Sequence, residues 1–149
     1  GRSYIVTCQV SGNFPGSPLD LRYTFILERG KIASLDDPAS KYVPAIADSA
    51  YGAISLRHLL RMSSGRIYSE NYSGSDDNAR ALSQMESQGA IAAINLFKGK
   101  PFHAPGTKFN YAGIESIVLN QVVSHATGQT IASRSQKRQR RRITRPVIP

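Results

Sequence analysis

The sequence has one cysteine, no apolar run long enough to cross a bilayer, and no pair of histidines at a metal-ligand spacing. Cys8 therefore cannot form an internal disulfide, and it has no neighbouring cysteine with which to hold a metal. The cysteine content consequently does not distinguish an oxidising from a reducing compartment. The three histidines, His58, His103 and His125, predict no metal site.

An apolar signal segment is also lacking, and the first residue is Gly rather than Met. We therefore expect a fragment of a longer protein. Its compartment stays open between the cytoplasm and, for a truncated N-terminus, the periplasm. A hydrophobic content of 40%, with 12 Gly and 8 Pro, is typical of a globular protein.

Acidic residues are missing after Ser133, and this absence accounts for most of the net charge. Seven of the 19 basic residues follow Ser133, so residues 1–133 carry only +2 of the net charge of +9. The segment 133–149 is predicted to be a basic, disordered tail. The body of the chain gives no electrostatic sign of a nucleic-acid partner.

Several catalytic and cofactor motifs do not occur either. The chain contains no Gly-x-Ser-x-Gly elbow, Walker loop, His-Glu-x-x-His motif or dinucleotide-type glycine run. We therefore predict no cofactor.

The secondary structure expected from the first half of the chain is mixed. Tyr4–Val10 is predicted to form a strand, and Leu21–Arg29 a short helix that ends at Gly30. Ala53–Met62 is predicted to form a helix with Ser55 as its N-cap and three inward leucines, Leu56, Leu59 and Leu60. Asp36 and Asp37 are interpreted as a solvated turn rather than a metal site.

The second half is predicted to be helical around a polar loop. Arg66–Asn78 is rich in Ser, Asp and Asn and is expected to be a surface loop, a type of segment that often carries function. Ala79–Gln88 and Ala90–Phe97 are expected to be two helices interrupted at Gly89.

Pro105–Gly128 is the most informative stretch of the chain. A Pro-Gly turn leads through an extended segment into a helix that is predicted to end at Gly128. Tyr111 then lies at or just before the first turn, where free N–H groups and the helix dipole favour a phenolate, so this tyrosine is a candidate base. The alternative is a half-buried packing residue with a satisfied hydroxyl.

Three blocks in this order, GKIASLDDPASKYVP, ISLRHLLRMSSG and PGTKFNYAGIESIVLNQVVSHATGQT, resemble landmarks of the serine beta-lactamase and penicillin-binding-protein superfamily. The most similar branch comprises class C beta-lactamases, related esterases and aminohexanoate-dimer hydrolases. The resemblance implies the α/β fold of that family, an antiparallel sheet beside a helical region. This chain is expected to form mainly the helical region, mostly α with little strand.

The resemblance further implies ester or amide hydrolysis of a small molecule through an acyl-enzyme, with Tyr111 as the proton-relay tyrosine. The family nucleophile lies in a Ser-x-x-Lys motif, and no lysine of this chain has a serine three residues before it. We therefore expect the chain to be inactive.

Two further residues are substrate-binding candidates by resemblance. Gly113 stands where class C enzymes have Asn in the tyrosine motif, which favours the esterase or amidase branch. Tyr72 matches a loop tyrosine that contacts the substrate amide in the dimer hydrolases, although a packing role is an open alternative.

The resemblance stops near Thr130, so we expect a poorly matched segment 1–20, a partial family domain 21–132 and the tail 133–149. A shifted reading frame at both ends would explain this pattern.

One alternative function is binding of nucleic acid or an acidic surface through the tail, which is disfavoured because the tail lacks interleaved aromatic residues. Another is an interaction module formed by an uncovered apolar face, and the oligomeric state stays open.

Overall fold

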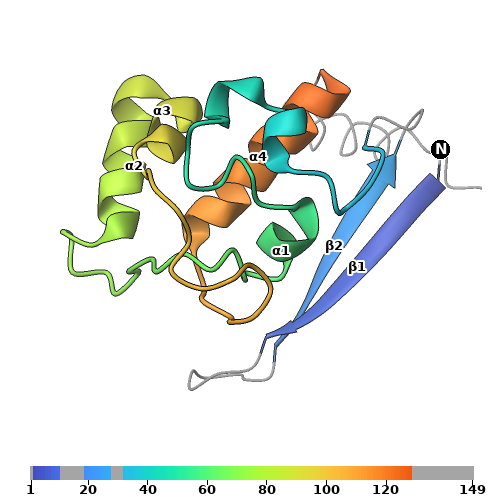
Figure 1. The fold of residues 1–149 in the computed structure, drawn as a ribbon, viewed down its shortest axis with the longest axis horizontal. Coiled ribbons are helices and arrows are strands. Elements are labelled where there is room, and N and C mark those ends of the chain that lie inside the picture. The colour runs from blue at the N-terminus through green and yellow to red at the C-terminus, as the bar shows by residue number, and fades with distance from the viewer. Residues whose placement is uncertain (1, 11–18, 28–31, 129–149) are drawn as a thin grey trace, which may run out of the picture.

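The computed structural model describes residues 2–10, 19–27 and 32–128. Two features expected from the sequence lie outside these residues: the end of a helix at Gly30 and the basic tail 133–149. In the described residues, helices form one body and a two-stranded hairpin lies to one side of it (Figure 1).

The hairpin consists of β1 (Arg2–Val10) and β2 (Leu19–Leu27). The strands are antiparallel, and their register pairs Tyr4 with Phe25. The predicted strand Tyr4–Val10 is confirmed as part of β1, whereas the helix predicted over Leu21–Arg29 is wrong because Leu21–Leu27 lies in β2, and the last two residues of the predicted helix lie outside the described residues. The segment LDLRYTFIL is rich in residues that suit a strand, and the backbone partner supplied by β1 decides between the two conformations.

Two short 3-10 turns, η1 (Ala39–Lys41) and η2 (Pro44–Ile46), lead into α1 (Leu56–Leu60). Ser55 is the N-cap of α1, as predicted, and accepts a hydrogen bond from the backbone N–H of His58. The helix is shorter than predicted at both ends: it begins after the Ser55 cap, and it ends at Leu60, shortly before Met62, whose left-handed φ of 50° does not continue a helix.

The turn before η1 was predicted to be solvated, but both of its aspartates also form ion pairs. Asp36 accepts hydrogen bonds from Nε and Nη2 of Arg57 at 2.7 and 3.2 Å, and Asp37 accepts one from Lys41 Nζ at 2.8 Å. Within the described ranges, no group of three or more His, Cys, Asp or Glu side chains is arranged to hold a metal ion.

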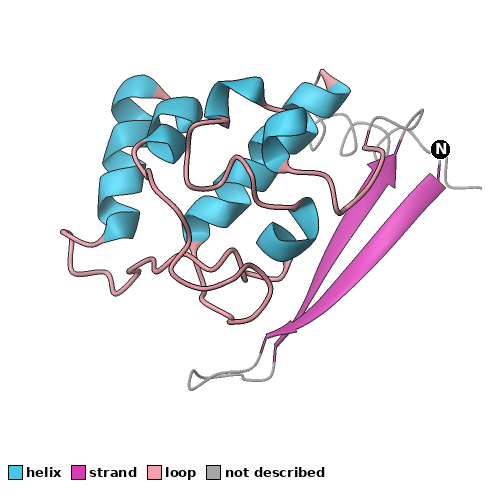
Figure 2. Cartoon of the chain, viewed as in Figure 1, coloured by secondary structure: helices cyan, strands magenta, loops and turns pink. Residues whose placement is uncertain are grey.

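The remaining helices follow the predicted order along the chain, and Figure 2 shows the helices in cyan and the two strands of the hairpin in magenta. They are α2 (Asp77–Gln88), α3 (Ala90–Asn95) and α4 (Gly113–Thr127). Gly89, with φ of 88°, separates α2 from α3, and Gly128, with φ of 63°, ends α4, as the sequence predicts. In the described part of the chain, no helix has the length and apolar character that crossing a membrane requires.

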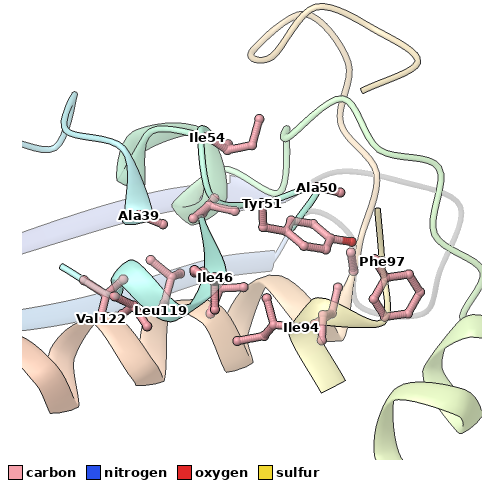
Figure 3. Packing of buried hydrophobic residues seen from close by; sticks show 14 of the residues in the cluster. Ala39, Ile46, Ala50, Tyr51, Ile54, Ile94, Phe97, Leu119 and Val122 are labelled. Atoms are coloured by element: carbon pink, nitrogen blue, oxygen red, sulfur yellow. The ribbon is translucent and has the colours of Figure 1, made fainter. Parts of the chain in front are cut away.

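The core lies where α1, α3 and η1 pack on α4 and η2 packs on α3, and Figure 3 shows part of it. Tyr51 packs edge-on against Phe97 with ring centroids 6.2 Å apart, and Tyr68 contacts the same ring at 5.5 Å. The three predicted leucines of α1 are all buried. The helix α4 contributes four buried apolar residues to this core: Ile114, Val118, Leu119 and Val122.

Candidate functional site

The loop between α1 and α2 is organised by one aspartate. Asp76 is the N-cap of α2, and its Oδ1 accepts a hydrogen bond from Ala79 N–H at 2.8 Å. Its Oδ2 accepts hydrogen bonds from the N–H groups of Asn71 and Tyr72 at 2.8 and 2.7 Å. These donors, Ala79 first, hold the pKa of Asp76 below its usual value. The carboxylate of Asp76 therefore has two roles: one oxygen caps the N-terminus of α2, and the other fixes the backbone of the loop.

A second clamp joins the two ends of the same loop. Ser69 donates to Asp77 Oδ2 through both its N–H and its hydroxyl, at 3.0 and 3.1 Å, and Asp77 N–H returns a bond to Ser69 Oγ at 2.9 Å. The loop predicted over Arg66–Asn78 is thus confirmed up to Asp76, where α2 begins two residues earlier than predicted, and hydrogen bonds between its own residues hold it.

Tyr72 is carried outward by this loop. Its side chain is 80% exposed, and its φ of 60° places it in the left-handed region that non-glycine residues adopt infrequently. Because the N–H of Tyr72 is bonded to the buried carboxylate of Asp76, the loop holds this conformation and presents the ring to solvent.

Tyr111 lies just before α4, as predicted, since Ala112 is the N-cap of that helix. The preceding residue, Asn110, is fixed by donating its N–H to Met62 O at 2.8 Å. The side chain of Tyr111 is half exposed. Partial burial raises its pKa, and the carboxylate of Glu70 and the nearby Tyr72 raise it further. The expected lowering of this pKa is therefore wrong for the isolated chain.

Gly113 is the first residue of α4, and it contacts a residue that the sequence did not single out. Its N–H donates a hydrogen bond to Glu70 Oε2 at 2.8 Å. A Cβ at this position would lie 3.1 Å from the same oxygen and 3.3 Å from Asn78 Oδ1, so glycine allows both groups to approach closely. The signal in the sequence was the N-cap itself: Ala112 has no side-chain acceptor, which leaves the first N–H of the helix free for an acceptor from another segment.

A buried acid follows on the first turns of α4. Glu115 is 1% exposed, and its Oε1 accepts a hydrogen bond from Ser64 Oγ at 2.6 Å. Burial raises the pKa of Glu115 to about 8, partly opposed by the hydrogen bonds from Ser64. Glu115 Oε2 and Tyr51 Oη are both buried without a hydrogen-bond partner among the residues that the structure describes. In the sequence, the sign of this buried acid was its position next to Ile114, an apolar residue of the predicted helix.

The structure therefore brings together four residues at the N-terminus of α4. They are the three candidates from the sequence, Tyr72, Tyr111 and Gly113, and the additional Glu70. Two of the three histidines stand apart, because His125 lies in the last turn of α4 and His58 lies on α1. The cluster offers an exposed phenol, a carboxylate and a helix N-terminus, a combination suited to binding and proton transfer.

Asp76 gives the first test of this arrangement. Replacing Asp76 by Ala removes acceptors from three backbone N–H groups, so we expect the amides of Asn71 and Tyr72 to exchange with solvent about tenfold faster. Hydrogen exchange followed by NMR measures this effect, with the exposed Asp48→Ala as the matched control. Equal exchange in the two variants would show that the aspartate does not hold the loop.

The family model for beta-lactamases matches residues 26–146, which is most of the chain. This chain belongs to the beta-lactamase family. The match extends beyond Thr130, where the resemblance seen in the sequence blocks stops. The fold class is confirmed: the described part is mainly helical, although its hairpin contributes more strand than expected.

One similar protein from Escherichia coli (strain K12) is described as "Putative D-alanyl-D-alanine carboxypeptidase" and is 27% identical over 109 residues, covering 71% of this chain and 25% of that protein. One similar crystal structure is that of a "putative beta-lactamase" from Bacteroides dorei DSM 17855. It has 30% identity and a TM-score of 0.46, and the match covers 65% of this chain and 27% of that one. The beta-lactamase-family chain thus spans about a quarter of the length of these relatives.

Proposed function

We propose that this chain is part of a serine hydrolase that cleaves an ester or amide bond in a small molecule through an acyl-enzyme. The observation that carries the proposal is the position of Tyr111. In a chain of this family, a half-exposed tyrosine directly precedes α4 and lies within electrostatic reach of Glu70 and Tyr72. A phenol in that position can pass a proton between a nucleophile and a leaving group.

The same proposal assigns roles to the other two candidates. Tyr72 contacts the substrate from the loop, which is consistent with its outward ring. Gly113 lets the loop approach the helix, which is a different role from the direct substrate contact that the sequence suggested. The nucleophile is not among the residues of this chain, because no Ser-x-x-Lys occurs in it.

We expect the chain alone to show no saturable turnover of p-nitrophenyl esters or of a chromogenic cephalosporin, since binding and electrostatics without a nucleophile leave little catalysis. Steady-state assays of the chain and of its Tyr111→Phe variant measure this. Saturable turnover that disappears in Tyr111→Phe would contradict the missing nucleophile.

A second arm tests the hydrolase itself. The DNA on both sides of this coding region should be sequenced and translated in every frame. A Ser-x-x-Lys motif should then appear upstream of the block GKIASLDDPASKYVP, which begins at Gly30, as the hypothesis of a shifted reading frame requires. In the restored protein, Tyr111→Phe should lower kcat about a hundredfold or more, while Tyr72→Phe should mainly raise KM. Absence of the motif in all frames would refute the proposal.

A further inference from the structure

The first turn of α4 has no cap from its own sequence. Ala112 occupies the N-cap position and makes no side-chain hydrogen bond, although the first N–H groups of a helix have no carbonyl partner one turn earlier in that helix. The acceptor comes from 43 residues earlier in the chain, as the carboxylate of Glu70 bonded to Gly113 N–H at 2.8 Å. A carboxylate at this end of a helix is also favoured by the helix dipole.

Glu70 is delivered to this position by neighbours that are fixed on both sides. Ser69 is bonded to Asp77, and the N–H of Asn71 is bonded to Asp76. Asn78, at the start of α2, donates its own N–H to Ser69 O at 3.1 Å. The carboxylate therefore belongs to a clamped loop, and its contact with α4 ties that loop to the segment that carries Tyr111.

The absence of a Cβ at Gly113 fits the shape of this contact. A Cβ would lie 3.1 and 3.3 Å from the two oxygens of Glu70, closer than ordinary van der Waals contact. Glycine therefore lets the carboxylate reach the first N–H of the helix without displacement.

The electrostatic consequence falls on Tyr111. The positive end of α4, which the sequence suggested would stabilise a phenolate, is already matched by the charge of Glu70. Partial burial is the main cause of the raised pKa of Tyr111, and among the described residues the charges of Glu70 and Tyr72 raise this pKa further. The phenol form is thereby favoured.

We propose that Glu70 is a positioning residue, which fixes the Tyr111 segment by capping α4 and places its negative charge beside that segment at the helix N-terminus. The role in catalysis rests on the proposed hydrolase function, whereas the contact and its effect on Tyr111 are properties of this chain. Glu70→Gln separates the two effects, because the amide oxygen keeps an acceptor for Gly113 while the charge is removed.

The experiment uses the full chain labelled with 13C at the tyrosine ring, with the Tyr111 signal assigned from Tyr111→Phe. In Glu70→Gln, the titration of Tyr111 should shift to lower pH, and the Gly113 amide should keep its protection from exchange. In Glu70→Ala, that amide should exchange about fivefold faster. Glu86→Gln, on the exposed face of α2, removes the same charge and should leave Tyr111 unchanged.

A measurement near neutral pH avoids unfolding during the titration. Nitration by tetranitromethane, which is selective for the phenolate, should be faster at Tyr111 in Glu70→Gln than in the wild type and in the control Glu86→Gln. Unchanged titration and nitration of Tyr111 in Glu70→Gln would overturn the proposal, whatever the result of the hydrolase assays. A missing Ser-x-x-Lys in the flanking DNA would refute the hydrolase and leave this result standing.

Discussion

Replacing Glu115 by Gln is expected to stabilise the chain at pH 8 and above by several kcal/mol, up to about 5 kcal/mol. The folded chain holds the proton of Glu115 up to a pKa of about 8, whereas the unfolded chain releases it near the usual value of 4.5. Between these values the unfolded state binds fewer protons, so the free energy of unfolding of the wild type falls as pH rises. Gln has no such titration and still accepts the hydrogen bond from Ser64.

Urea unfolding followed by circular dichroism at pH 5, 7 and 8.5 measures this effect. The wild type should lose stability across the series relative to Glu115→Gln, and the control Glu86→Gln should follow the wild type. The lowered pKa of Asp76 affects stability only in more acid solution, below its usual value of 3.8. Parallel curves for the wild type and Glu115→Gln would show that Glu115 is ionised in the folded chain at neutral pH.

Replacing Gly65 by Ala is expected to destabilise the chain by about 3 kcal/mol or more. Gly65 has φ of 82°, and a Cβ there would lie 2.1 Å from the carbonyl oxygen of His103. The carbonyl of Gly65 also accepts hydrogen bonds from the N–H groups of Phe102 and His103, both at 3.0 Å. Any movement that relieves the clash therefore disturbs the contact between the end of α1 and the segment before Tyr111.

Gly74→Ala is the matched control for this clash. Gly74 has nearly the same φ, 81°, but a Cβ there would meet no atom within 4 Å, so only the cost of the left-handed backbone remains, about 1 kcal/mol. Chemical denaturation of the two variants compares the steric effect directly. Equal losses of stability would mean that backbone strain alone, without the contact to His103, accounts for the result.

The helices after residue 53 could be predicted because their signals are local. The cap at Ser55, the interruption at Gly89 and the end of α4 at Gly128 each depend on residues within one or two turns. The prediction for Leu21–Arg29 was wrong because its conformation depends on pairing with β1. Strand pairing joins residues far apart in the chain, and a pattern within one segment does not contain it.

For the candidate site, the sequence by itself determined that Tyr111 immediately precedes a helix, that a polar loop precedes α2 and that no Ser-x-x-Lys is present. Only the tertiary structure decided the direction in which the pKa of Tyr111 shifts and the partners of Gly113 and Glu115. Glu70 and Ser64 reach α4 from 43 and 51 residues away in the chain. Burial and charge act through space, so a pKa depends on which distant groups the fold places beside the residue.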